Sequence, residues 1–450
     1  SKLNYSFFIS SGETSKRLIA SAKSLDVNYK LSRHLKNNLT YENYMEHFKK
    51  DNLTKEKKET VVFYQPINKY GTALTNAVDD NNIDMIDLII NHSSFDKNKS
   101  LIDVAIAKAV YSNNVEIMRK LLELNNNDIN IFDTDGNNLL KYAVMNENEE
   151  VLLELLNNEN FDSKKFNLVQ AFVDSYSIHN NDKNIIIDEN TFSPINIQME
   201  KILKDNDFIN NNIANMKSPM NVMNILYNYD LQHDHLIDFS NLLSNGKSFF
   251  TSIYTQSEFV GDIVNFFLAN GCDPNKPDKF NVYPLEYAIN KNSNVFVMNL
   301  MNSNQIDYSV EICSTESVTL VTEYKYLLQS INREENKKIP NDVKGITFLH
   351  LAVISSSSIL NQFLIRNVID VNVKNSLSET PLIIACKNRK KDCIRMLFQE
   401  DDLDYLHKNN EGKNALDIIE CVSLRMGNQS SDDIDQNDRN EFLNRLLSYV

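Results

Sequence analysis

A short sequence pattern recurs in the last third of the chain at intervals of 33 to 34 residues. Leu349, Leu382 and Leu416 hold the same place in three copies, 33 and then 34 residues apart. A fixed interval of this size is typical of proteins in which one small unit stacks on copies of itself and buries its apolar face against them. A single core rarely grows beyond about 250 to 300 residues, so a chain of 450 residues fits an open stack well.

The residues within each copy resemble the ankyrin repeat family. The family's Thr-Pro-Leu-His-x-Ala signature is matched in part at residues 347–352 and again at 380–385. Less complete copies lie at residues 71–77, 136–143 and 283–288, and a weaker one is centred on Ala109. The resemblance implies an all-α repeat solenoid of stacked ankyrin-like helix-turn-helix repeats with short β-hairpin loops, interrupted by insertions.

Glycine, proline and paired aliphatic residues stand where such repeats need them. Gly345 and Gly412 allow a tight turn before a first helix. Pro381 suits the first helical turn, where a missing N–H costs little. Pairs such as Leu121-Leu122 predict an apolar face on each second helix, which only a neighbouring repeat can cover.

The strength of the match divides the chain into five segments. In chain order, we expect an N-terminal helical cap or appendage, ankyrin-like repeats, degenerate repeats with insertions, further ankyrin-like repeats, and an acidic loop with a C-terminal capping helix. These segments are residues 1–66, 67–160, 161–248, 249–426 and 427–450.

Two finer expectations concern the fourth segment. A first helix is predicted near residues 249–254, ahead of a second helix that starts at Val260. The 64 residues between Leu285 and Leu349 leave room for one degenerate repeat, which we place at residues 306–338.

Charge and cysteine usage narrow the class of protein. The net charge is −15, so phosphate backbones and anionic membrane surfaces are repelled on average. Five scattered cysteines without metal-ligand spacing fit a reducing compartment better than a disulfide framework. No stretch reaches the roughly 18 apolar residues that span a bilayer. We expect a cytoplasmic chain, monomeric on its own, with no nucleic-acid partner and no membrane insertion.

Two sets of residues offer metal-binding or catalytic side chains. His233 and His235 lie in one short segment with three aspartates, but histidines two residues apart on a helix point in different directions, and no third ligand is evident. A surface or insertion segment is the favoured interpretation, and metal binding is the alternative. The cysteines, all from Cys272 onward, lie on or beside repeat elements, where a buried apolar role is expected. Phosphate-binding loops and serine-nucleophile signatures are absent. We predict no metal, no cofactor and no enzymatic activity.

The resemblance implies that a protein partner is bound by the hairpin tips and by a concave groove lined with first helices. Six predicted contacts lie at hairpin tips: Lys276, Asp278, Lys374, Asn375, Lys408 and Asn409. Three more lie at the end of one first helix: Lys387, Asn388 and Arg389. The last three form a basic stretch with Lys390 and Lys391, for which a solvated turn is the default interpretation and docking of an acidic peptide is the alternative.

Asparagines in three hairpins follow an aspartate two residues earlier. The pairs are Asp128 and Asn130, Asp273 and Asn275, and Asp370 and Asn372. Such side chains commonly satisfy the backbone groups of a turn. By resemblance to animal ankyrin repeats, in which such residues are hydroxylated, Asn372 is also a candidate for hydroxylation. The same resemblance implies that His350 braces neighbouring hairpins by hydrogen bonds.

The sequence therefore predicts a non-catalytic scaffold for protein–protein interaction. The alternative is an effector of an intracellular microbe, acting in the host cytosol, with a divergent enzymatic module in residues 1–66 or 161–248. Helix pairs in register with the stack at 161–248 favour the scaffold, whereas a sheet with converging polar groups there favours the enzyme.

Overall fold

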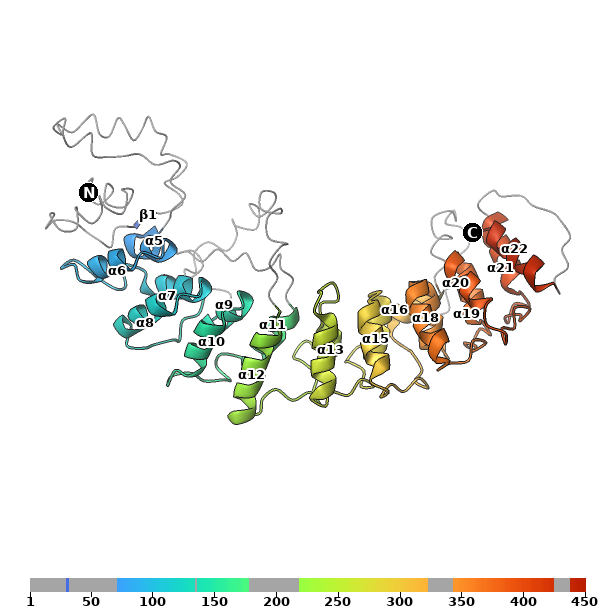
Figure 1. The fold of residues 1–450 in the computed structure, drawn as a ribbon, viewed down its shortest axis with the longest axis horizontal. Coiled ribbons are helices and arrows are strands. Elements are labelled where there is room, and N and C mark those ends of the chain that lie inside the picture. Colours follow the sequence, from blue (N-terminus) through green and yellow to red (C-terminus); the bar gives the residue numbers. More distant parts are fainter. Residues whose placement is uncertain (1–29, 32–70, 134–135, 178–217, 323–342, 425–437) are drawn as a thin grey trace, which may run out of the picture. The chain divides into compact units, whose positions relative to one another are not determined.

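The structure is a computed structural model that describes residues 30–31, 71–133, 136–177, 218–322, 343–424 and 438–450. The chain divides into two compact units, Ser1–Ile237 and Asp238–Val450. Each unit is a series of helix pairs in which a first helix is followed by an antiparallel second helix (Figure 1). The predicted all-α repeat solenoid is confirmed. Residues 1–66, except 30–31, and the acidic loop at 427–437 lie outside the described residues.

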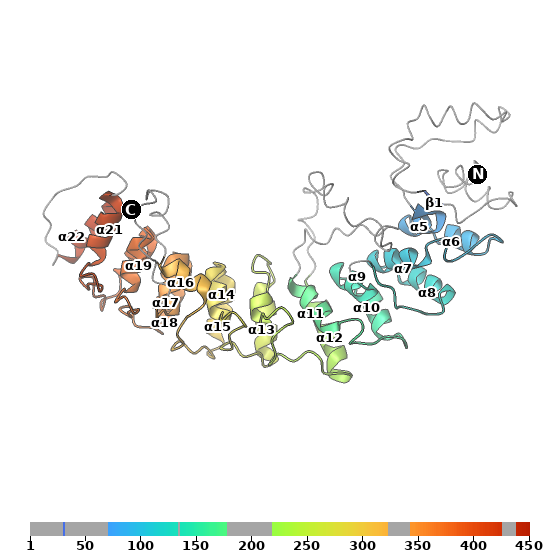
Figure 2. The ribbon, with the colours of Figure 1, turned by 180° about the vertical axis from the view of Figure 1, so that it is seen from behind.

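Unit 1 holds four helix pairs within its described residues. Its first helices are α5 (Ala73–Asp79), α7 (Ile102–Tyr111), α9 (Leu139–Met145) and α11 (Leu168–Ser177). Its second helices are α6 (Ile83–Ile90), α8 (Val115–Leu124), α10 (Glu149–Leu156) and α12 (Met220–Gln232). Each first helix packs on the first helix of the next pair, which gives the ladder seen in Figures 1 and 2.

Unit 2 continues the same scheme from residue 238. Its first helices are α14 (Pro284–Asn290), α17 (Phe348–Ser355), α19 (Pro381–Lys387) and α21 (Ala415–Leu424). Its second helices are α13 (Val260–Ala269), α15 (Asn294–Asn302), α18 (Ser357–Arg366), α20 (Lys391–Leu397) and α22 (Arg439–Ser448). The partner of α13 is the 3₁₀ turn η4 (Phe250–Ser252).

The helix predicted near residues 249–254 is therefore only a single 3₁₀ turn. The Ser252 hydroxyl donates to the Phe249 carbonyl at 2.7 Å. Side-chain bonds of this kind compete with the helical ladder. The chain then becomes irregular until α13 begins.

Local chemistry explains why the helix pairs form. Asn114 begins α8 by accepting a hydrogen bond from the Ile117 backbone N–H at 2.9 Å, which satisfies one of the free donors at the helix start. The turn before it places Asn113 at φ 54, a left-handed conformation that asparagine tolerates better than most residues. Leu121 and Leu122 on α8 are 0% and 4% exposed, as their apolar pairing predicts. Packing against the neighbouring pair thus stabilises helices too short to persist alone.

The prediction of a degenerate repeat at residues 306–338 is wrong. Helix α17 packs directly on α14, and α18 packs directly on α15, so no repeat is inserted between these pairs. The Ile312 N–H donates to the Ile346 carbonyl at 2.9 Å, which closes a hairpin across 34 residues. In the regular hairpin of unit 1 the same bond joins Asp133 to Asn137, only four residues apart. The described residues between Ile312 and Ile346, including helix α16 (Thr315–Thr322), belong to an insertion at a hairpin tip.

The two described strands are short and lie at the start of unit 1. Strand β1 (Lys30–Leu31) pairs antiparallel with β2 (Gly71–Thr72), with Lys30 opposite Thr72. The buried Thr72 hydroxyl accepts from the Thr75 N–H at the start of α5 and donates to the Ser100 carbonyl at 2.7 Å. In the part of the chain that the structure describes, no helix is long and apolar enough to cross a membrane.

Candidate protein interface

Four hairpins share one hydrogen-bonding geometry. A single Asp or Asn in each donates its backbone N–H to the carbonyl four residues later, and its side-chain oxygen accepts backbone N–H groups of the same turn. These residues are Asp133, Asp278, Asn375 and Asn409. In Asn375, for example, Oδ1 accepts from Leu377 and Glu379 at 2.9 and 3.0 Å. Each tip is thus internally braced.

This geometry corrects three of the predicted contacts. Asp278, Asn375 and Asn409 are only 7%, 5% and 8% exposed. Their side chains turn inward because the N–H groups of the tip have no other strong acceptor, and an unsatisfied buried donor is costly. These residues shape the hairpins, and they are not free to contact a partner.

Lys276, Lys374 and Lys408 behave differently. All three are exposed on the tips of hairpins in unit 2. Lys374 and Lys408 immediately precede the inward-turned asparagines, so the rigid turn directs successive side chains to opposite sides. The Lys276 ammonium also donates to the Ser240 carbonyl. These lysines remain candidate contacts.

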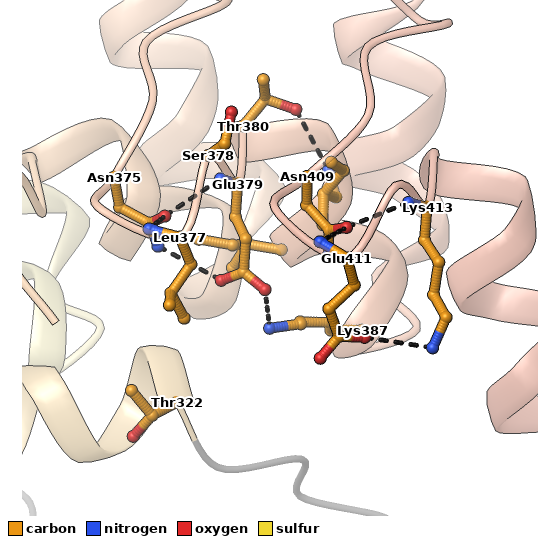
Figure 3. A network of polar contacts seen from close by, with 12 residues as sticks. Thr322, Asn375, Leu377, Ser378, Glu379, Thr380, Lys387, Asn409, Glu411 and Lys413 are labelled. Carbon is orange, nitrogen blue, oxygen red and sulfur yellow. Dashed lines mark hydrogen bonds and ion pairs between the residues drawn. The ribbon is translucent and has the colours of Figure 1, made fainter. Parts of the chain in front are cut away.

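The prediction that Lys387 contacts a partner is also wrong. Its side chain is 5% exposed and forms an ion pair with Glu379, whose side chain is 3% exposed. Glu379 also accepts a hydrogen bond from Asn375 Nδ2 at 3.2 Å. Figure 3 shows this network between the hairpin and the end of α19. Lys387 lies inside the stack because Glu379 provides a buried counter-charge, so neither the solvated turn nor the acidic-peptide interpretation applies to it.

The residues that follow Lys387 also have structural roles. Asn388 is 5% exposed and its Nδ2 donates to the Ile384 carbonyl at 3.0 Å, which makes it a helix cap and corrects its prediction as a contact. Arg389 adopts φ 52 and its guanidinium donates to the Tyr449 carbonyl at 2.5 Å. Arg389 therefore links the turn between α19 and α20 to Tyr449, the residue that caps α22.

The predicted role of the paired hairpin residues is confirmed. The N–H of Asn130, Asn275 and Asn372 donates to the carboxylate of the aspartate two residues earlier, at 2.8 to 2.9 Å. Asn372 has a further role: its Nδ2 donates to the Asp402 carbonyl at 2.7 Å, and its Oδ1 accepts from the Asp404 N–H at 2.8 Å. The side chain therefore links two neighbouring repeats. Hydroxylation of Asn372 stays a prediction.

His350 braces neighbouring hairpins, as the resemblance implies. Its Nδ1 accepts from the Thr347 N–H at 3.1 Å, so Nε2 carries the proton and donates to the Glu379 carbonyl at 3.1 Å. Burial lowers the pKa of His350 to about 4. The imidazole is therefore neutral at physiological pH and serves as a fixed structural link.

Glu286 holds the corresponding signature position on α14, and the sequence did not single it out. The side chain is fully buried. Its Oε2 accepts from the Tyr283 N–H at 3.0 Å, and its Oε1 accepts from the hydroxyls of Ser314 and Ser317. Burial raises the pKa of the Glu286 carboxyl, and the two serine hydroxyls oppose that rise. An acid in place of the signature histidine was the one signal that could have marked this site.

The segment containing His233 and His235 forms the end of a helix. His233 stacks on Tyr229, with ring centroids 4.1 Å apart, and Nδ1 of His233 lies 2.8 Å from the Tyr229 carbonyl. The buried Asp230 carboxylate accepts from the N–H groups of Leu236 and Ile237 at 2.8 and 2.9 Å. Among the described residues, no group of three or more His, Cys, Asp or Glu side chains is arranged to bind a metal ion.

Three of the described thiols are buried: Cys272, Cys386 and Cys393. Burial raises the pKa of Cys272 to about 12 and that of Cys393 to about 11. A thiol that stays protonated is a poor nucleophile. Cys313 is exposed.

Parts of the chain are similar to the ankyrin repeats of known proteins. A family model for ankyrin repeats, in three copies, matches residues 74–167 and 349–424. A poly(ADP-ribose) polymerase tankyrase of Caenorhabditis elegans is 33% identical over 132 residues, which are 29% of this chain. The chain spans only 5% of the length of that relative.

Proposed function

We propose that this chain, an ankyrin-repeat protein, is a non-catalytic scaffold that binds a protein partner through its hairpin tips and the groove beside its first helices. Ankyrin repeats form protein–protein interaction domains. The observation that carries the finer proposal is the exposure of Lys276, Lys374 and Lys408 on internally braced hairpins of unit 2.

Rigid presentation favours binding by these tips. The hairpins are joined to one another: the Ser376 N–H donates to the Lys344 carbonyl at 2.8 Å, and the Asn410 N–H donates to the Leu377 carbonyl at 3.0 Å. A partner therefore orders few backbone groups when it binds, which lowers the entropic cost of association. Lysine side chains favour a partner with acidic residues at matching intervals.

The alternative function, an effector with an enzymatic module, has less support. In the described part of residues 161–248, α11 packs on α9 and α12 packs on α10, so this helix pair is in register with the rest of unit 1. Such a pair extends the scaffold. We propose that the chain acts in the cytoplasm, as a monomer and without a cofactor; if it is a secreted effector, that compartment is the host cytosol.

Affinity capture from cell lysate, followed by quantitative mass spectrometry, tests the role of the tips. Lys374→Glu and Lys408→Glu are compared with the intact chain. Arg395→Glu on α20 is a matched control, because Arg395 is exposed on a second helix and the charge change is the same.

A protein recovered by the intact chain and by Arg395→Glu, but lost with Lys374→Glu or Lys408→Glu, supports the proposal. Equal recovery with all four chains excludes the tips as the binding surface.

A further inference from the structure

Helix α16 lies on a face formed by the first helices α14 and α17. On α5 the residue at the end of the helix is Asp79, which forms an ion pair with Lys108 of α7 at 2.6 Å and has a side chain that is 41% exposed. On α14 the residue at this place is Asn290, and its Nδ2 donates to the Ser317 hydroxyl of α16 at 2.9 Å. The insertion thus places a helix over a position that is partly open to solvent on α5.

The contact between α16 and α14 is polar and specific. Ser314, just before α16, and Ser317, one turn into it, both donate to Oε1 of Glu286, the second at 2.5 Å. Both serines are buried, and so is Val321 one turn further on. Helix α16 also packs against α17. The docked side of α16 therefore consists of the hydroxyls of Ser314 and Ser317 and the aliphatic side chain of Val321.

An amphipathic helix laid against a prepared face is a common mode of peptide recognition. Helix α16 has only eight residues, too few to persist in water without the surface beneath it. Both ends of the insertion are fixed by the bridge between Ile312 and Ile346, so the segment stays close to the face even when the helix is released.

From this arrangement we infer that the face formed by α14 and α17 is a helix-docking surface, which α16 occupies in the free chain. Its external ligand is a helix of a protein partner that presents hydroxyl donors to Glu286 and an aliphatic side chain to α17. Such a ligand displaces α16. The inference rests on the proposed function in one respect, that the partner is a protein, and it does not depend on the lysine tips.

Hydrogen exchange measured by mass spectrometry tests whether α16 is separately docked. In the intact chain, α16 should exchange at least about tenfold faster than α14 and α17, because its release does not require unfolding of the stack. Ser314→Ala with Ser317→Ala should raise its exchange by a further factor of about ten, since two bonds to a carboxylate are lost. Thr322→Ala is the control, because that hydroxyl bonds within α16 at 2.8 Å.

A labelled synthetic peptide with the sequence of residues 311–322 tests whether the face binds a helix in trans. Fluorescence anisotropy should show binding to the double-alanine chain about tenfold tighter than to the intact chain, where α16 competes. Glu286→Ala should release α16 but fail to bind the peptide, with the exchange of α19 unchanged as a check on folding.

Two results overturn the inference. One is exchange of α16 at the same rate as α14 and α17 in every variant, which makes α16 an inseparable part of the core. The other is equal peptide binding by the intact, double-alanine and Glu286→Ala chains. Loss of partner capture on reversal of the lysine charges bears only on the proposed function, so the failures of the two proposals are distinguishable.

Discussion

Replacement of Lys387 tests whether its charge stabilises the fold or is available to bind a partner. Lys387 and Glu379 are both almost fully buried and paired, so Lys387→Met leaves a carboxylate in the interior without its counter-charge. Breaking a buried pair in this way costs about 3–5 kcal/mol of unfolding free energy. Lys374→Met, at an exposed tip, should change that free energy by less than about 0.5 kcal/mol.

The double variant Glu379→Gln with Lys387→Met makes the prediction sharper. It removes both charges, so most of the lost stability should return, and the coupling between the two sites should amount to about 2 kcal/mol or more. The chain has no tryptophan and two units, so hydrogen exchange of peptides from α19 and α20 in rising denaturant is a suitable readout. If Lys387→Met is no more destabilising than Lys374→Met, the ammonium is solvated and the assignment is wrong.

Three further predictions concern two links between repeats and one turn within a repeat. The pKa of His350 in the folded state is about 4, against an ordinary value of 6.5, so the stability that His350 contributes is fully present above pH 6.5 and is lost as the pH falls toward 4. Up to about 3 kcal/mol of unfolding free energy should disappear across that window. In denaturant titrations at several pH values, His350→Gln should show a smaller loss. Asn372→Ala removes both hydrogen bonds to the next hairpin and should lower the free energy of unfolding by about 1–2 kcal/mol. Asn130→Ala, which removes a hydrogen bond from Nδ2 to Asp128 within one turn, should lower it less. Equal losses of unfolding free energy in denaturant titrations would argue against the bridging role of Asn372. Gly412 has φ 74 with open space where a Cβ would stand, so Gly412→Ala should cost about 1 kcal/mol through backbone strain alone, and thermal unfolding should show Gly412→Asn to be milder.

The repeat interval predicted most of the fold because each repeat packs mainly against its neighbours. Residues at the same place in successive copies, such as Leu349 and Leu382, face the same packing environment, so their spacing predicts the stacking of helix pairs. The insertion was missed for the same reason. A gap of 64 residues between Leu285 and Leu349 is close to two repeat lengths. The packing of α17 on α14 and the pairing of Ile312 with Ile346 reveal that it is one repeat with an interrupted hairpin.

The candidate contacts were predicted less well, because residue type does not reveal the direction of a side chain in a tight turn. Lys374 and Asn375 are adjacent and both polar, yet Lys374 is exposed and Asn375 is buried, with only 5% of its surface exposed. The turn chemistry that correctly explained Asn372 applies equally to Asn375. Lys387 was harder to predict, since its partner Glu379 lies eight residues earlier across the start of a helix, outside the usual helical spacing of ion pairs.

The most direct test of the central claim is a hydrogen-exchange footprint of the intact chain bound to a partner recovered from lysate. We expect slower exchange at the hairpin tips 370–380 and 404–414, with little change on the second helices α15, α18 and α20. Protection confined to those second helices would contradict binding through the tips and first helices.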